Sequence, residues 1–434
     1  MIDGTGLMNS NPVLISTLTL RYLVSEYTYI FRRTIMKFMN YAQENAAPSV
    51  KTVSEAEYRL ALAEIELSSE AVAVGARMLD EGTNFLTASE SIVAHIEASK
   101  EEGLQEKEAT AISRHFNYLT VELGMGSTQI CASENFTDAV SRVAASEASA
   151  EGIKKAMKTA FEVIRTTIKK LISKAVTFVK TFVSGIDKVT AKAEEELEEL
   201  TKFDKEIDEK KFKDKWEGTA ASSTKGGLKA VADSAKLAVS ITKMSTKAAK
   251  DMISSAEKTK ASDIDVKGFL KDDASADVLK SLESVVKDPE LVKVAGPFIG
   301  NSYVYWAIPN TKEGVDKLSW IVKGGVTSVK AAKEPVPSKS EIEKGLNVVV
   351  SAKLDELSGA TKELDSLASD IDKVIIAIIN EDGMEADDAK FLKLLVTGIA
   401  NGITMTNTKT MVLAAKAAKA VISTSAAYRG SAKA

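Results

Sequence analysis

The clearest pattern along the chain is the recurrence of apolar residues at helical spacing. Between Gly152 and Lys192 these residues step by three, four or seven positions and form one continuous apolar stripe. The stripe consists of Ile153, Met157, Phe161, Ile164, Ile168, Leu171, Ala175, Val179, Phe182, Ile186 and Val189. At 1.5 Å per residue, a helix of this length extends about 60 Å. We therefore expect a long amphipathic helix that begins at Gly152.

Residues 53–123 show the same helical spacing. Ser54 and Glu57 have the spacing of a capping box, which predicts that a helix begins there. Gly82 and Gly103 predict breaks, because glycine weakens a helix interior. This region is therefore expected to form two or three helices.

The rest of the chain alternates helical patterns with segments rich in small residues, serine or proline. Residues 294–311 carry no charge but contain two prolines and two glycines, which favours a buried irregular or short-strand insert. Helical patterns lie at about 228–260, 342–380 and 385–427. Connecting segments are expected at 124–151, 218–227 and 332–341.

These elements predict an all-α fold of long amphipathic helices in bundles, with a small irregular or short-strand insert near residues 294–330. The 240 residues between Pro48 and Pro289 contain no proline, which favours long helices. The chain divides into an amino-terminal extension or arm at 1–35, an acidic helical domain at 36–151, a cationic long helix with an acidic continuation at 152–217, a helical region with the insert at 228–331, and a carboxy-terminal helical hairpin at 341–434.

Charge is distributed unequally between the two parts of the chain. Residues 1–151 contain 11 Lys/Arg and 21 Asp/Glu, against 46 and 40 in residues 152–434. The predicted helix at 152–192 carries ten basic residues and only two acidic ones, Glu162 and Asp187. Such polarity indicates an acidic segment that masks a basic body with a polyanionic partner. An ordinary solvated bundle helix, or one that lies on an anionic membrane, is the alternative.

The composition argues against enzyme chemistry. One cysteine and two histidines leave little for metal ligation or base catalysis, and neither a GxGxxG motif nor a phosphate-binding loop ending in Gly-Lys-Ser/Thr occurs. We expect no catalytic site, no metal, no cofactor and no small-molecule substrate. Residues 13–35 look apolar, but Arg21 and Glu26 interrupt them, so they are not expected to span a bilayer.

Small-x-Glu tripeptides are concentrated just before the change of charge. Ala132-Ser133-Glu134, Ala145-Ser146-Glu147 and Ser149-Ala150-Glu151 fall within 20 residues. Tripeptides of this kind also arise by chance in a chain rich in Ala, Ser and Glu. Their position nevertheless makes Glu134, Glu147 and Glu151 candidate sites of proteolytic cleavage.

The order of these elements resembles the internal head (inner capsid, prohead core) proteins of large tailed bacteriophages. The resemblance rests on EEGLQEKEATAISRHFNYLTVELGM at 101–125, ASENF at 132–136 and the Gly-Ile-Lys-Lys opening of the cationic helix at 152–155. The carboxy-terminal segment at 392–430 is also similar to the last helices of that family.

The resemblance implies a structural virion protein packed inside the phage head and assembled in the host cytoplasm. Its implied partners are the capsid, other internal head proteins, a maturation protease that removes the acidic front, and phage DNA bound without sequence specificity. The candidate DNA-contacting residues are Lys154, Lys155, Lys158, Arg165, Lys169, Lys170, Lys174 and Lys180. The alternatives are a helical membrane-active, pore-forming protein and a non-enzymatic helical scaffold.

Overall fold

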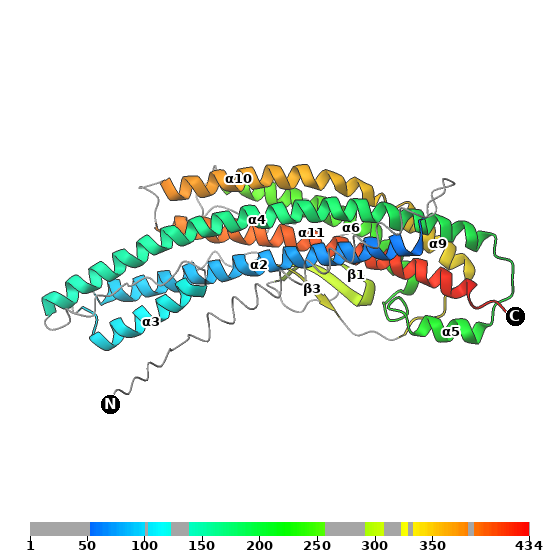
Figure 1. The fold of residues 1–434 in the computed structure, drawn as a ribbon, viewed down its shortest axis with the longest axis horizontal. Coiled ribbons are helices and arrows are strands. Elements are labelled where there is room, and N and C mark those ends of the chain that lie inside the picture. Colours follow the sequence, from blue (N-terminus) through cyan, green and yellow to red (C-terminus); the bar gives the residue numbers. More distant parts are fainter. Residues whose placement is uncertain are drawn as a thin grey trace, which may run out of the picture. The chain divides into compact units, whose positions relative to one another are not determined.

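The computed structural model describes residues 53–99, 103–122, 139–256, 291–307, 323–328, 333–380 and 386–433. The chain divides into two units, Met1–Lys51 and Thr52–Ala434, and every described residue belongs to the second (Figure 1). Helices make up most of this unit, with one small antiparallel sheet. The predicted all-α class with a short-strand insert is confirmed. The predicted extension at 1–35 lies outside the described residues.

The first described helices are α2 (Glu55–Ala98) and α3 (Glu106–Glu122). Both halves of the predicted capping box form at Ser54 and Glu57, so α2 begins where the sequence indicated. The predicted break at Gly103 is confirmed, and its φ of 67° lies in the left-handed region. The predicted break at Gly82 is wrong, because Gly82 is buried inside α2, and packing outweighs a propensity cost of about 1 kcal/mol.

The long helix α4 (Ala139–Thr201) begins before the predicted start at Gly152. Residues 139–151 are therefore helical, and the prediction of a connector over all of 124–151 is wrong for that part. Ser146, Ser149 and Ala150 are buried, and the Ser146 hydroxyl accepts a hydrogen bond from the Leu104 amide, so packing stabilises this part of the helix. At 1.5 Å per residue, the 63 residues of α4 extend about 95 Å.

The helices α2 and α4 pack closely along their length. A β-carbon on Gly75 of α2 would lie 3.1 Å from Cδ1 of Leu171, and one on Gly185 of α4 would lie 3.0 Å from Cδ1 of Ile65. Each helix therefore presents a glycine to a large side chain of the other, and the two backbones approach closely.

A short helix, α5 (Glu209–Glu217), precedes α6 (Gly227–Ala256) and the sheet. The sheet is antiparallel in the order β1 (Leu291–Phe298), β2 (Ser302–Ala307), β3 (Lys323–Ser328). The turn η2 (Ile299–Asn301) docks on the loop before α6, where the Asn301 amide donates to the Ser223 oxygen at 2.6 Å and Oδ1 accepts from the Lys225 amide at 2.6 Å. The sheet is thereby fixed to the bundle.

The last elements are α9 (Lys339–Val350), the 3-10 turn η4 (Leu354–Gly359), α10 (Ala360–Asn380) and α11 (Ala386–Arg429). The single helical pattern predicted at 342–380 is wrong in one respect, since the chain leaves the helix at Ser351 and resumes it at Ala360. Lys353 adopts a φ of 51° there, a conformation that a helix interior excludes.

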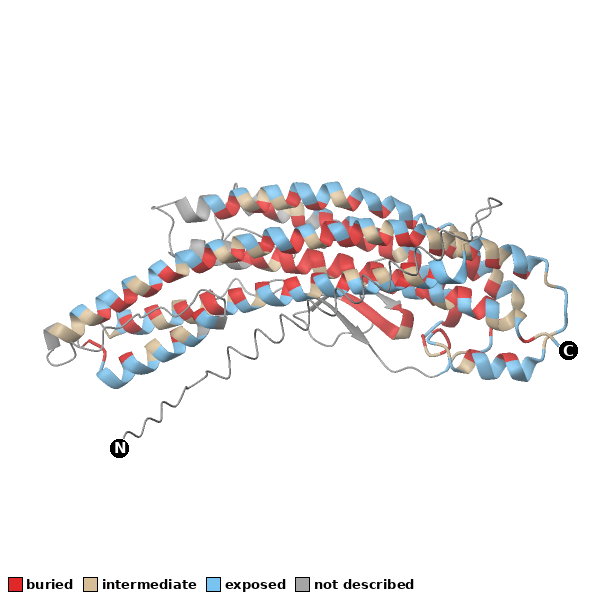
Figure 2. Ribbon diagram, in the orientation of Figure 1, coloured by how far each residue is buried: buried red, intermediate tan, exposed pale blue. Residues whose placement is uncertain are grey.

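The core of the unit lies around α11, which contacts α2, α4, α6, α9, α10 and the sheet. Figure 2 shows buried residues along the helices that face it, with exposed residues on the outer helices. A helix surrounded in this way is apolar or small on all sides, which explains why Ala and Thr are frequent in α11.

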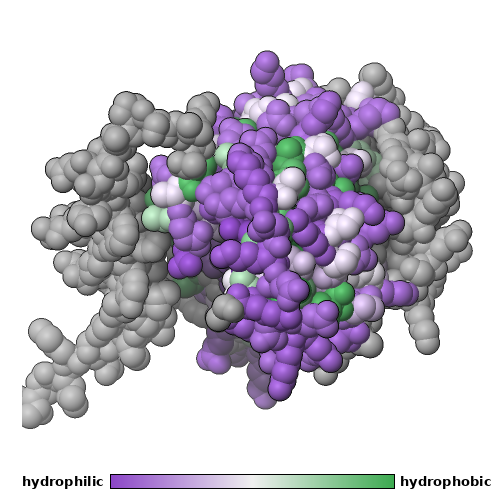
Figure 3. All heavy atoms as spheres, turned by 90° about the vertical axis from the view of Figure 1, so that its right-hand side faces the viewer, coloured by the Kyte–Doolittle hydropathy of each residue, from purple (hydrophilic) through white to green (hydrophobic). Residues whose placement is uncertain are grey.

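The carboxy terminus is held by the last turns of α4 and by the segment between α4 and α5. Arg429 pairs with Glu196 at 2.7 Å and with Glu199 at 2.5 Å, and Ile207 forms a β-bridge with Ala432. Part of the acidic run at the end of α4 is thus used for an internal contact. Figure 3 views this end of the molecule and shows a mostly hydrophilic surface with small, separate apolar spots.

Candidate nucleic-acid interface and processing region

The helix α4 separates its apolar and basic residues onto different faces. Of the eleven residues in the predicted stripe, all except Met157 are buried. The exposed residues of α4 form a strip that runs between α2 and α10 (Figure 2). We call the exposed or half-buried Lys155, Lys158, Lys170, Lys174 and Lys180 on this face the basic strip.

Three of the eight candidate DNA-contacting residues are held by acidic residues of other helices. Lys154 pairs with Glu97 of α2 at 2.7 Å. Arg165 donates to both oxygens of Asp372 in α10 through Nε at 2.6 Å and Nη2 at 3.2 Å, and Lys169 reaches the same carboxylate at 3.0 Å. These three residues therefore connect helices.

The pKa of Asp372 lies below its ordinary value. The hydrogen bonds from Arg165 have the largest effect, and Lys169 adds to it, which together outweigh the opposing effect of partial burial. The carboxylate is consequently ionised over a wide pH range and neutralises part of the positive charge of α4.

The five lysines of the basic strip make no ion pair with any other described residue. No acidic residue occurs between Glu162 and Asp187, so α4 itself supplies no carboxylate beside Lys170 or Lys174, and the exposed side chains next to them include Ser173 and Thr177. From Lys155 to Lys180 the strip extends about 38 Å. The five lysines are spread over the exposed side of the helix along this length, which suits contact with phosphates.

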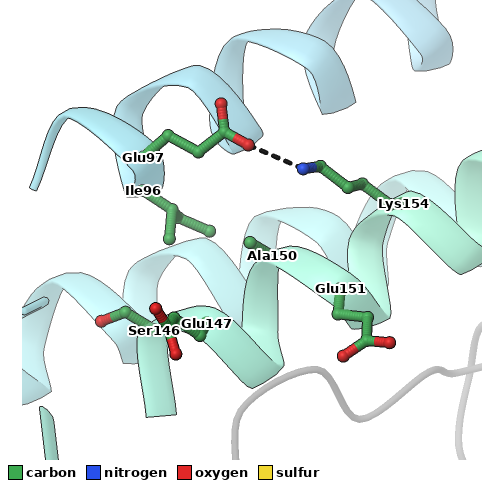
Figure 4. A pocket seen from close by; sticks show the side chains of 7 residues that line it. All are labelled: Ile96, Glu97, Ser146, Glu147, Ala150, Glu151 and Lys154. Carbon is green, nitrogen blue, oxygen red and sulfur yellow. Dashed lines mark hydrogen bonds and ion pairs between the residues drawn. The ribbon is translucent and has the colours of Figure 1, made fainter. Parts of the chain in front are cut away.

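Two of the three candidate cleavage residues lie in the amino-terminal part of α4, and Glu134 lies outside the described residues. A hollow of about 280 Å³ lies between α2 and α4. Figure 4 shows the side chains that line it, Ile96, Glu97, Ser146, Glu147, Ala150, Glu151 and Lys154. Glu147 and Glu151 are exposed, whereas Ser146 and Ala150 beside them are buried.

The helix at these residues is tied to its surroundings. The Ser146 hydroxyl accepts a hydrogen bond from the Leu104 amide at 2.9 Å, which joins α4 to the segment before α3. A protease binds an extended chain, so cleavage after Glu147 or Glu151 requires local unwinding of α4. The two carboxylates are accessible, but the peptide bonds that follow them are in regular helix.

The described residues show no arrangement typical of an enzyme. They contain no group of three or more His, Cys, Asp or Glu that could hold a metal ion. His95 and His115 are exposed on α2 and α3, and Cys131 lies outside the described part. Among the helices described, none is long and apolar enough to cross a membrane.

Sequence reasoning did not find Glu97 and Asp372, the residues that neutralise part of α4. Asp372 is 207 positions from Arg165 along the chain, and Glu97 is 57 from Lys154. No spacing rule connects residues so far apart, since their meeting depends on how helices pack. One local signal was available: Asp372 and Glu97 each lie on a helix with a clear apolar face.

Comparison with known proteins gives one match. A family model described as phiKZ-like phage internal head proteins matches residues 60–432, which include nearly all of α2 and every later element. Neither a curated protein nor a solved structure matches the chain.

Proposed function

Because the chain belongs to the phiKZ-like phage internal head proteins, we propose that it lies against packaged DNA inside the phage head and contacts phosphates through the basic strip of α4. The observation that carries this proposal is the set of unpaired lysines on the exposed side of this helix. Lys154, Arg165 and Lys169 are excluded from the main contact because acidic neighbours hold them.

The expected binding is weak and independent of sequence. Each phosphate that a lysine neutralises releases counterions. The logarithm of the binding constant therefore falls linearly with the logarithm of the salt concentration, with a slope of about 0.9 per contact. Five lysines on a body that also carries many carboxylates give a slope of at most about 4.5. Such binding is effective at the DNA concentration of a filled head.

The other proposed partners are the capsid and further internal head proteins. In this role the protein needs no cofactor, no metal, no small-molecule substrate and no catalytic site. The proposed function is structural, in line with the family's description as internal head proteins.

We also propose that the maturation protease cuts the acidic front after Glu134, Glu147 or Glu151. Support comes from the change of charge at this point of the sequence and from the exposure of Glu147 and Glu151. Mass spectrometry of the protein from purified particles is expected to show a new amino terminus at Asn135, Ala148 or Gly152. An uncut chain in mature particles would contradict processing but leave the DNA proposal standing.

The DNA proposal is tested by replacing all five lysines of the basic strip with alanine. Binding of the full chain to duplex DNA is measured between 50 and 200 mM salt, on the order of the range in which phosphate contacts dominate. The variant is expected to lose most of its affinity, and the salt slope to fall by up to about 4.

A matched control removes five other exposed lysines, Lys210, Lys211, Lys229, Lys236 and Lys344, which lie on α5, α6 and α9 and make no ion pair among the described residues. The net charge of the two variants is then equal. Equal loss of affinity in both variants would show that only net charge matters, and a wild-type affinity that does not change with salt would refute phosphate binding altogether.

A further inference from the structure

The helix α2 carries a second apolar face that no other described element covers. Its first apolar face is buried against α4 and α11. Leu67, Val74 and Met78 lie elsewhere on the helix and are 50%, 44% and 53% exposed, and Ala71 between them is exposed as well. These three are among the most exposed large apolar side chains of the described residues.

The spacing of this face is that of a coiled coil. Leu67, Ala71, Val74 and Met78 follow one another at intervals of four, three and four residues, which is the seam of a heptad repeat. We call these four residues the α2 seam.

The same line of α2 already receives a helix further along. Phe85 lies on this line seven residues after Met78, toward the carboxy-terminal end of α2, and is buried. Phe116 of α3 packs on Phe85 with ring centroids 5.5 Å apart. The line therefore has the shape and chemistry to accept a helix, and the α2 seam is its uncovered half.

The charges beside the seam identify a partner. Glu70 and Arg77 each precede a seam residue, at the positions of a heptad that face a second helix. Both are exposed, and neither forms an ion pair with another described residue. Two such helices in antiparallel orientation are self-complementary, because Glu70 of each lies opposite Arg77 of the other.

We propose that the α2 seam pairs two copies of this chain as an antiparallel, two-fold symmetric helix pair. Leu67 then contacts the partner's Met78, Ala71 contacts the partner's Val74, and two equivalent ion pairs join Glu70 to the partner's Arg77. A symmetric contact of this kind closes on itself and does not produce filaments.

The charges also exclude the neighbouring arrangements. Shifting the antiparallel pair by one heptad, so that Leu67 meets the partner's Ala71, places Glu70 against the partner's Glu70. A parallel pair places Glu70 and Arg77 beside the partner's Gly75 and Gly82, without opposite charges. Glu64 and Glu81 bound the seam and limit the contact to these four layers, so the association is expected to be weak and to depend on concentration.

The test measures the mass of the full chain by sedimentation over a range of concentrations. The wild-type protein is expected to change from monomer to dimer as concentration rises. Arg77→Glu brings two pairs of like charges together and is expected to raise the dissociation constant by about tenfold. Glu70→Arg is expected to act in the same way, whereas the exchange of both residues in one chain restores dimers.

Arg114→Glu on the exposed side of α3 is the matched control, since it makes the same change in net charge away from the seam. Val74→Asp tests the apolar contact, and circular dichroism of each variant verifies that the helices are intact. The proposal is overturned if the wild type remains monomeric, if dimers persist in Val74→Asp, or if the charge exchange does not restore association. Dimerisation lost equally in the Arg114 variant would also overturn it.

Discussion

Among single residues, Asp372 has two effects that can be separated by experiment. It joins α10 to α4 through Arg165 and Lys169, and it neutralises two cations next to the basic strip. We expect Asp372→Asn to reduce the free energy of unfolding at pH 7 by about 1 kcal/mol, because the pair is partly exposed. The same change should increase affinity for duplex DNA and raise the salt slope by up to about 2, since two cations are released.

The pH dependence gives a second measurement of the same carboxylate. Because the hydrogen bonds from Arg165 and the contact with Lys169 lower the pKa of Asp372 in the folded chain, its stabilising effect is complete above the ordinary Asp pKa of about 3.9. The effect is lost as the pH falls through the lower, folded value. Urea unfolding should therefore distinguish wild type from Asp372→Asn at pH 7 and cease to do so in strong acid.

Asp365→Asn is the control for this pair of measurements. Asp365 is exposed on the same helix and forms no ion pair with a described residue, so its replacement should leave both stability and the salt slope nearly unchanged. If the two variants bind DNA equally, Asp372 does not restrain the cations of α4.

At the level of elements, the contact between α6 and α11 is unusual because it buries hydroxyls. The Asn407 amide donates to Oγ1 of Thr246 at 3.1 Å, but the hydroxyls of Thr242 and Thr408, both 1% exposed, have no hydrogen-bond partner among the described residues. A buried polar atom without a partner costs about 1–3 kcal/mol. Each of these two buried hydroxyls therefore lowers the stability of the fold.

This argument predicts opposite effects for similar substitutions. Thr408→Val and Thr242→Val should each raise the free energy of unfolding by about 1 kcal/mol, because each removes an unsatisfied hydroxyl. Thr246→Val should lower it, since the Asn407 amide loses its acceptor. Urea denaturation measures the free energy of unfolding of the three variants. A loss of stability in all three would show that the hydroxyls of Thr242 and Thr408 form hydrogen bonds in solution.

Elements with strong local signals could be predicted from sequence. The capping box at Ser54 and the apolar stripe of α4 each depend on neighbours within a few residues, and both were confirmed. The break before Ala360 was not predicted, because it depends on the left-handed conformation of Lys353. The early start of α4 was not predicted either, because it depends on packing against the segment before α3. The basic residues of the candidate interface could likewise be predicted from the sequence. The acidic residues that pair with three of these eight could not, because they come from other helices.

On the scale of the whole molecule, the described residues of the acidic front, which begin at Val53, do not form a body apart from the basic one. The buried side chains of α2 belong to the same core as those of α4 and α11. They include Leu62, Ile65, Val72, Leu79, Phe85 and Val93. Each such side chain contributes about 1.5–3 kcal/mol when fully buried. Cutting the chain between α3 and α4 breaks one peptide bond and none of these contacts.

We therefore predict that a cut after Glu134 leaves the two fragments joined. A recognition sequence for a specific protease, inserted between Glu134 and Asn135 of the full chain, allows the cut to be made in vitro. The fragments should elute together in native chromatography, even at high salt because the contact is apolar, and separate only in denaturant. Gly185→Leu, which places a large side chain against Ile65, should weaken the contact by about 1–3 kcal/mol, so the cut variant should separate at a lower denaturant concentration than the cut wild type. Release of the front from the cut wild type under native conditions, with α4 still helical, would contradict the prediction. If the fragments remain joined, removal of the front during maturation must involve unfolding or degradation of α2 as well as a single cut.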